Sequence, residues 1–299
     1  MTGPAGGSSP RGGLAPAAEL RAALSGVRAL VLDADGVLVM RGAALPGAAE
    51  ALARLHERGT PYRVATNLSA AHRESVAARF AGMGLPVPPE RIVTALSATA
   101  EHVRRTYPGQ PVFVITRPDG LREFGDHPLM GPAQADADDA RVAAVVLGDG
   151  DHDLSYENLD RAFRLIRRGA DLIAMHRNGW WYTSKGETID TGAFVAALEY
   201  ATSTRARLTG KPAPPMFRAA FAGLAADVAA AGGRRLVRDQ VAMVGDHAPQ
   251  DIAGARRAGL RGILVLSGRT AADEVADLRG LAVPAAVTAT LSDVVAALD

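Results

Sequence analysis

Short apolar runs alternate with amphipathic stretches along most of the chain, and this alternation limits the fold more than any other feature of the sequence. A run that is apolar at every position indicates a strand buried on both faces, as in a parallel sheet covered by helices. The expected strands cover 27–32, 62–65, 112–115, 142–147, 171–175, 207–209, 241–244 and 262–266. The expected helices cover 48–58, 70–82, 156–168 and 193–201. This order predicts an α/β fold.

The length of the chain favours more than one domain. A chain of 299 residues is long for one compact domain and sufficient for two, or for one domain with a large insertion. Residues 1–16 are mainly Gly, Pro, Ser and Ala, and we expect them to form a disordered leader. This stretch lacks the continuous apolar segment of a secretory signal, and no part of the chain has the apolar length that spans a bilayer.

Composition excludes several kinds of chemistry. The chain has no cysteine, so disulfides, thiolate metal sites and a thiol nucleophile are excluded. This also fits a reducing cytoplasm, which is the location we predict. The formal net charge of +1 gives no reason to expect a nucleic-acid surface, and we expect neither a nucleic-acid nor a membrane partner.

Two carboxylates follow the first predicted strand, in the segment Asp33-Ala34-Asp35-Gly36. Ligands bind at the carboxyl ends of the strands in an open parallel sheet. Two carboxylates at this spacing can divide the work of phosphoryl transfer: one attacks phosphorus, and the other protonates the leaving oxygen and later deprotonates water. Gly36 lets the chain turn so that both side chains face one point. The alternative is an ordinary acidic turn after a strand.

Polar residues that could hold a phosphate follow two further predicted strands. Thr66 and Asn67 could donate hydrogen bonds to phosphoryl oxygens, although they could equally belong to a helix cap. Lys211 could neutralise a phosphate, and Pro212 restricts it to an extended conformation. Taken alone, a single lysine is more often a solvated surface charge.

A fourth group of polar residues follows the predicted strand 241–244. Asp246 could complete a magnesium site with Asp33, because magnesium takes one or two carboxylates and substrate phosphate oxygens. Asp251 could bind the metal or orient its waters. It could also be an acidic residue favoured by the helix dipole at the start of a helix, and the two interpretations are compatible.

These four groups, in this order and at these separations, resemble the motifs of the haloacid-dehalogenase superfamily. The resemblance is greatest to its sugar- and aryl-phosphatase group, whose members carry a large α/β cap between the second and third motifs. It runs from about residue 27 to residue 268 and includes Arg41-Gly42, Leu45-Pro46-Gly47, Lys211-Pro212-Ala213-Pro214 and the stretch 245–259. It implies a doubly wound, Rossmann-like parallel-sheet core with an inserted α/β cap domain. The core would comprise 17–96 and 206–299, and the cap 97–205.

The same resemblance implies roles at the first and last motifs. Asp33 matches the nucleophile and a magnesium ligand, and Asp35 matches the acid/base, whose backbone carbonyl also reaches the metal. Asp246 matches the other protein ligand of magnesium, and Asp251 matches its acidic neighbour, which would orient the waters on the metal. The presence of Asp35 argues against a dehalogenase, since dehalogenation leaves no oxygen that needs a proton.

At the two middle motifs the resemblance implies phosphate binding. Thr66 and Lys211 match the residues that grip the phosphoryl group, and Asn67 follows in the same loop. One departure is Leu68, which replaces the second Asn of a Thr-Asn-Asn-Ser pattern common in the capped group. It places in question any contact which that amide would make to the substrate or the cap.

Within the predicted cap, the segments 175–182, 190–194 and 197–201 together resemble the branch typified by phospholysine–phosphohistidine–inorganic-pyrophosphate phosphatase. His176, Arg177 and Asn178 follow a predicted strand and could contact a leaving group. The alternative is an exposed β-turn at Asn178-Gly179. The resemblance is also compatible with a homodimer formed through the cap.

The sequence therefore predicts a magnesium-dependent phosphatase for a small phosphorylated metabolite, which would be its main partner. The expected bond is a phosphoric monoester, with a phosphoanhydride or a phosphoramide as alternatives. A phosphomutase is a second hypothesis, although the gap over 37–65 is too short for the helical cap typical of such mutases. A non-catalytic phosphometabolite-binding or regulatory protein is a third. The sequence does not identify the substrate.

Overall fold

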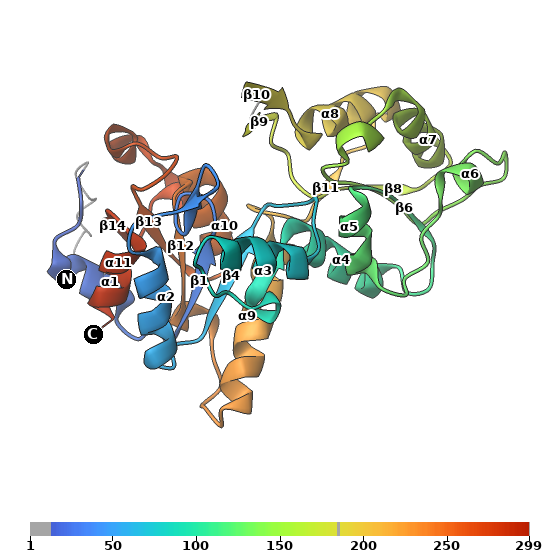
Figure 1. The fold of residues 1–299 in the computed structure, drawn as a ribbon. Helices are drawn as coiled ribbons and strands as arrows, with labels where there is room; N and C mark the ends of the chain where they lie inside the picture. Colours follow the sequence, from blue (N-terminus) through green and yellow to red (C-terminus); the bar gives the residue numbers. More distant parts are fainter. Residues whose placement is uncertain (1–12, 184–185, 299) are drawn as a thin grey trace, which may run out of the picture. The chain divides into compact units, whose positions relative to one another are not determined.

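The computed structural model describes residues 13–183 and 186–298, which form two compact units (Figure 1). The first unit comprises the described residues up to Arg63, with 83–85 and 224–298. The second comprises 64–82 and 86–223. Most of the predicted leader lies outside the described residues, and the predicted boundaries of core and cap stay predictions. Among the residues described, no helix is long and apolar enough to cross a membrane.

The first unit is built on parallel strands. Their order is β14-β13-β12-β1, and every neighbouring pair is parallel. The strands are β1 (Ala29–Asp33), β12 (Val241–Gly245), β13 (Arg261–Val265) and β14 (Ala286–Thr288), with a small antiparallel pair, β2 (Val39–Met40) and β3 (Ala43–Ala44). Strands β1 and β12 are buried at every position, as the continuous apolar runs predict.

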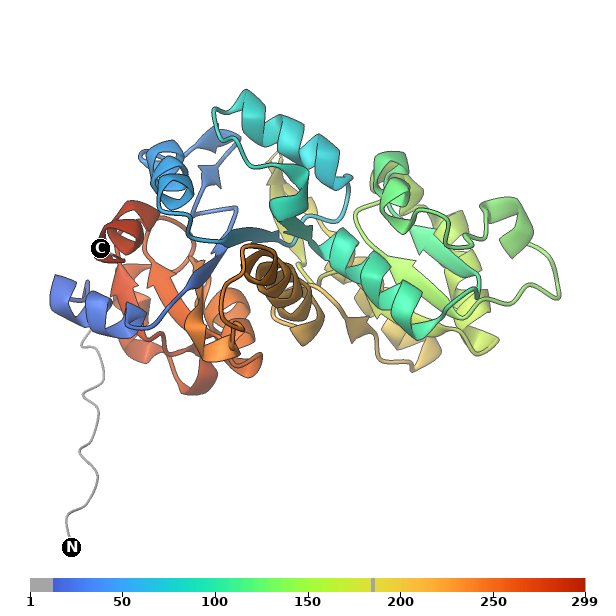
Figure 2. The same cartoon turned by 90° about the horizontal axis from the view of Figure 1, so that it is seen from below.

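Helices from both ends of the chain pack together in the first unit. The helices are α1 (Ala17–Leu24), α2 (Ala48–Glu57), α10 (Ala253–Arg257) and α11 (Leu291–Ala297), with short turns η4 (Arg238–Gln240), η5 (Ala248–Ile252), η6 (Ala272–Asp277) and η7 (Gly280–Ala282). Helix α11 contacts both α1 and α2, so the first and last described segments lie side by side (Figure 2). Leu52 and Leu55 lie on the buried face of α2.

The second unit contains a separate parallel sheet in the order β11-β8-β7-β6. Its strands are β6 (Val112–Ile115), β7 (Ala144–Leu147), β8 (Asp171–Ala174) and β11 (Arg207–Leu208), with an antiparallel hairpin, β9 (Trp180–Thr183) and β10 (Gly186–Ile189). Strand β4 (Tyr62–Thr66) enters this unit at Val64 and pairs in parallel with β5 (Ile92–Thr94).

Helices cover both faces of the sheet in the second unit. The helices of this unit are α3 (Arg73–Gly82), α4 (Ala95–Thr106), α5 (Pro118–Leu121), α6 (Pro132–Ala135), α7 (Tyr156–Arg167) and α8 (Thr191–Thr202), with turns η1 (Pro89–Arg91), η2 (Arg122–Phe124) and η3 (Asp151–Asp153). Helix α9 (Pro214–Ala230) leaves this unit after Gly223. Figure 1 shows α7 and α8 on one face of the sheet and α4 and α5 on the other.

The predicted α/β fold class is confirmed, and the differences from the sequence expectation are local. The short strands β5 and β14 were not predicted, because three-residue runs carry too little periodicity. Tyr156, the first residue of α7, is 81% exposed, because it opens the helix beyond the packed segment. Asn178 and Gly179 lie between β8 and β9, with a bend at Gly179, and the β9–β10 pairing begins at Trp180 and continues to Thr183.

The core beneath α7 yields a stability prediction. Leu165 is 1% exposed and packs in the apolar cluster between α7, α8 and the sheet. Leu165→Ala removes buried methyl groups and leaves a cavity, so we expect the free energy of unfolding to fall by about 2–5 kcal/mol in urea denaturation. Tyr156→Ala, on the same helix, is the matched control and should change the free energy of unfolding by no more than about 0.5 kcal/mol. Equal effects of the two variants would contradict this packing.

Candidate active site

Three aspartates gather at the carboxyl ends of β1 and β12 in the first unit. Leu32 pairs with Val244 in parallel register, which brings the ends of the two strands to the same edge. Asp33 and Asp246 are each 6% exposed, and Asp251, in the turn η5, is fully buried. Each of the three aspartates offers one carboxylate oxygen, and these atoms lie within 4.8 Å of one another. The structure therefore brings together two of the predicted metal ligands, Asp33 and Asp246, and their predicted neighbour Asp251.

Two glycines leave room for the carboxylate of Asp246. A β-carbon on either Gly36 or Gly268 would overlap that carboxylate, and Gly36 also has a φ of +75°, which L side chains rarely adopt. The Arg269 N–H donates to Asp246 Oδ2 at 2.6 Å. Gly268 and Arg269 were not predicted as site residues. Their position just after the predicted strand 262–266 was the sequence signal that could have identified them.

The chemistry of this cluster fits a hard divalent cation. All three groups are carboxylates, the oxygen ligands that magnesium and calcium prefer. Three like charges so close in a buried site repel one another, and a cation offsets that repulsion. Asp251 Oδ2 accepts a hydrogen bond from the His247 N–H at 3.0 Å, which fixes the orientation of its carboxylate. Within 13–183 and 186–298, no other three acidic, histidine or cysteine residues form such a group.

Asp35 has a different environment from Asp33, although only one residue separates them. Its side chain is exposed, whereas that of Asp33 is buried. A tight turn follows Asp35, in which the Gly36 N–H donates to the Val39 carbonyl oxygen at 2.8 Å. An exposed carboxyl exchanges protons with solvent, as an acid/base requires. The catalytic roles of both residues stay predictions.

The second unit fixes the backbone of Lys211 through Asn67. The Lys211 N–H donates to Asn67 Oδ1 at 2.8 Å, and Asn67 Nδ2 donates to the Lys211 carbonyl oxygen at 3.1 Å. A β-carbon on Gly210 would lie 2.7 Å from Asn67 Oδ1, so only glycine leaves space for this pair. Thr66 and Lys211 are 4% and 3% exposed. The side chain of Asn67 thus contacts the backbone of one predicted phosphate-binding residue.

The three predicted specificity residues, His176, Arg177 and Asn178, contact different parts of the second unit. His176 is 3% exposed, and its Nε2 lies 3.0 Å from Ser69 Oγ. Arg177 is exposed and forms a two-bond ion pair with Glu199 on α8, at 3.0 and 2.5 Å. The Asn178 carbonyl oxygen accepts a hydrogen bond from the Gly192 N–H at 2.9 Å. Their predicted contact with a leaving group stays a prediction.

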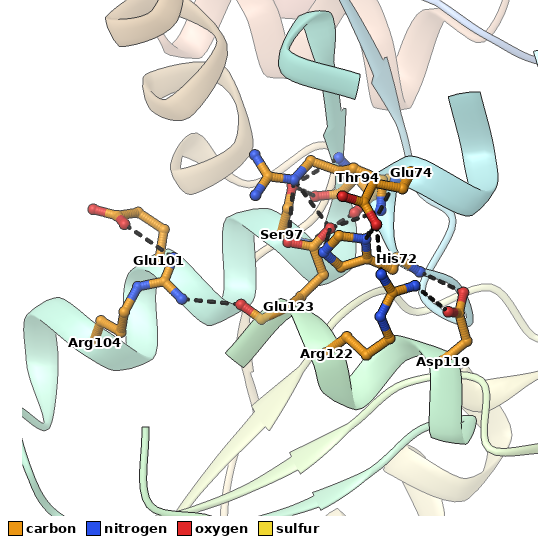
Figure 3. A network of polar contacts seen from close by, with 10 residues as sticks. His72, Glu74, Thr94, Ser97, Glu101, Arg104, Asp119, Arg122 and Glu123 are labelled. Atoms are coloured by element: carbon orange, nitrogen blue, oxygen red, sulfur yellow. Dashed lines mark hydrogen bonds and ion pairs between the residues drawn. The ribbon is translucent and has the colours of Figure 1, made fainter. Parts of the chain in front are cut away.

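A polar network in the second unit anchors the start of α3 (Figure 3). The Arg73 N–H donates to Glu123 Oε1 at 2.8 Å, and the Arg73 side chain also binds this carboxylate. The His72 N–H donates to Asp119 Oδ2 at 2.9 Å, and the hydrogen bond from Arg122 is the main cause that lowers the pKa of Asp119. Acceptors from the turn region 119–123 therefore occupy the first N–H groups of α3, which need partners at any helix start.

Comparisons with known proteins place the chain in a family. The family model described as haloacid dehalogenase-like hydrolase matches residues 30–127, and a HAD-hydrolase-like model matches 208–294. Haloacid dehalogenase-like hydrolase domain-containing protein 2 of Bos taurus is 32% identical over 249 residues, 83% of this chain and 88% of that protein. Phospholysine phosphohistidine inorganic pyrophosphate phosphatase of Homo sapiens is 29% identical over 252 residues, 82% of this chain and 85% of that protein.

A solved phosphatase structure also resembles this chain. The crystal structure of a glycerol phosphate phosphatase from Mycobacterium tuberculosis in complex with magnesium matches with a TM-score of 0.77 and 25% identity. The match covers 91% of this chain and 77% of that one. The chain belongs to the haloacid dehalogenase-like hydrolase family, and phosphatases are among its relatives. The resemblance stated from the motifs is confirmed.

The packing around Asp246 yields a prediction for the metal site. Gly268→Ala would push against the carboxylate of Asp246, so we expect the affinity for a divalent cation to fall by about 10- to 100-fold. Titration calorimetry with Mg²⁺ measures this change directly. Gly82→Ala is the matched control, because nothing lies within 4 Å of its added β-carbon. Unchanged affinity in the Gly268 variant would show that the cation does not depend on the position of Asp246.

Proposed function

We propose that this hydrolase is a magnesium-dependent phosphatase that acts on a small phosphorylated metabolite through an aspartyl-phosphate on Asp33. The observation that carries the proposal is the buried group of Asp33, Asp246 and Asp251 at the ends of adjacent parallel strands. Hard oxygen ligands favour magnesium. The phosphatase names among the relatives support the same chemistry. The expected bond is a phosphoric monoester, with a phosphoanhydride or a phosphoramide as alternatives.

The proposed reaction has two steps. In the first, a carboxylate oxygen of Asp33 attacks phosphorus, the bond from phosphorus to the leaving oxygen breaks, and the Asp35 carboxyl gives that oxygen a proton. In the second, the Asp35 carboxylate takes a proton from water as the water oxygen attacks phosphorus, which releases phosphate and restores Asp33.

The predicted residues would also bind the metal and the phosphoryl group. Asp33 and Asp246, with the backbone carbonyl of Asp35 and Asp251 as an acidic neighbour, would hold magnesium, which would offset charge on the phosphoryl oxygens. The Thr66 hydroxyl and the Lys211 ammonium group would hold those oxygens, a role that rests on the family pattern of these residues. A homodimer stays a prediction.

A phosphomutase is the second candidate, and one observation weighs against it. Between the first two motifs, the structure has the small β2–β3 pair and helix α2. Helix α2 packs on α11 within the first unit, so it belongs to the packed layers of that unit. This segment is therefore not available as a separate helical cap.

The first test is phosphate release from a panel of sugar phosphates, nucleotides, phosphoglycolate, pyridoxal phosphate, pyrophosphate and phosphoamino acids. We expect release with magnesium, none with chelator, and a rate below about one thousandth of wild type for Asp33→Asn, which removes the nucleophile. The control is Asp277→Asn, whose exposed carboxylate lies in the turn η6. Full activity in the Asp33 variant would disprove its role as nucleophile, and a wild type that released no phosphate would favour a binding protein.

The role of Asp35 has a separate test. Asp35→Asn cannot take a proton from water, so we expect turnover to fall by about 10²- to 10⁴-fold and phosphoenzyme to accumulate. Intact-protein mass spectrometry after an acid quench measures the phosphorylated fraction. If the double variant with Asp33→Asn and Asp35→Asn forms no phosphorylated species, the phosphoryl group is assigned to Asp33. Unchanged turnover in Asp35→Asn would remove its acid/base role.

A further inference from the structure

Ser69 is held by the ends of three strands of the parallel sheet in the second unit. Its Oγ accepts a hydrogen bond from the Asp149 N–H at 2.9 Å, just after β7, and lies 3.0 Å from His176 Nε2, just after β8. Its carbonyl oxygen accepts from Thr116 Oγ1 at 2.6 Å, just after β6. A β-carbon on Gly148 would lie 3.0 Å from the same carbonyl oxygen. Ser69 is therefore the point at which the loop after β4 rests on this sheet.

The contacts of His176 define which ring nitrogen carries a proton. The Asn178 N–H faces Nδ1 at 3.4 Å, so Nδ1 acts as an acceptor and Nε2 keeps the hydrogen. Nε2 then donates to Ser69 Oγ. Burial lowers the pKa of His176, while the carboxylates of Asp190 and Asp149 act in the opposite direction. The ring is a buried, neutral donor, and both of its nitrogens have partners within the protein.

This arrangement is not that of a Ser-His-Asp triad. In a triad the carboxylate binds the ring nitrogen opposite the one that faces the serine. Here Asp190 Oδ1 lies 3.8 Å from Nε2, the same nitrogen that faces Ser69. The Ser69 oxygen already accepts from the Asp149 N–H. The hydrogen bond between His176 and Ser69 therefore holds the loop in place and does not prepare a nucleophile.

The loop held at Ser69 carries the predicted phosphate-binding groups. Thr66 lies three residues earlier, and its Oγ1 accepts from the Leu68 N–H at 3.3 Å, which leaves the hydroxyl hydrogen available as a donor. Asn67 binds both backbone polar groups of Lys211. A displacement of Ser69 would thus move Thr66 directly and Lys211 through Asn67.

We propose that His176 is a positioning residue that fixes the phosphate-binding geometry of Thr66 and Lys211 through its hydrogen bond to Ser69. This inference rests on the proposed phosphatase function. It differs from a specificity role, in which His176 would touch the leaving group. Positioning acts on the phosphoryl group that all substrates share, so its effect is the same for every leaving group.

The kinetic test compares His176→Ala, His176→Gln and Ser69→Ala on two substrates with unlike leaving groups. We expect His176→Ala to raise KM about five- to tenfold on both substrates, and to raise the inhibition constant of inorganic phosphate by the same factor. His176→Gln places an amide donor near Nε2 and should recover most of the affinity. In the double variant, His176→Ala should raise KM little beyond the value of Ser69→Ala alone, because both changes remove the same hydrogen bond. His102→Gln, on α4 of the same unit, is the matched control.

A second measurement does not depend on turnover. Hydrogen–deuterium exchange should be faster at the amides of 67–72 in His176→Ala, and near wild type in His176→Gln, if the hydrogen bond holds the loop. Unchanged exchange there would overturn the inference. An effect on KM confined to one leaving group would also overturn it, in favour of a specificity role. A wild type without phosphatase activity would refute the proposed function, and the exchange experiment would still decide the inference.

Discussion

The candidate site depends on the parallel pairing of β1 with β12. Side chains alternate between the two faces along a strand, so a register shifted by one residue would turn the side chains of one strand to the opposite face of the sheet. The observed register matches Leu32 with Val244 and brings Asp33 and Asp246 to one edge. Gly36 and Gly268 then leave the space that the Asp246 carboxylate occupies. The strand register and the space left by the two glycines together allow three acidic groups to lie close together in a buried site.

In the second unit, the residues at the carboxyl ends of the parallel strands hold a loop of the chain. Thr116, Asp149 and His176 follow β6, β7 and β8. They form no acidic cluster like that of the first unit, and all three contact Ser69. This sheet therefore supports a loop from another part of the chain. The Asn67–Lys211 pair extends that support to a lysine more than a hundred residues away. In the proposed mechanism, Asn67 would in this way affect phosphate binding without touching phosphate.

Family membership sets the general chemistry and leaves the substrate open, because similar folds serve many reactions. The relatives include a phospholysine phosphohistidine inorganic pyrophosphate phosphatase and a glycerol phosphate phosphatase, whose names describe different substrates. Their common feature is the phosphoryl group. The roles proposed for Asp33 and for the loop at Ser69 concern this group, so they do not depend on which leaving group the substrate carries.

The sequence by itself determined the α/β class, most of the long strands and helices, and the aspartates at the ends of β1 and β12, because continuous apolar runs and short motifs are local properties of the chain. Only the tertiary structure decided that Gly268 borders Asp246 and that Asn67 binds the backbone of Lys211. It also decided that His176 is buried against Ser69. These contacts join residues far apart in sequence, and hydrogen bonds and steric fit depend on distances that no local pattern records.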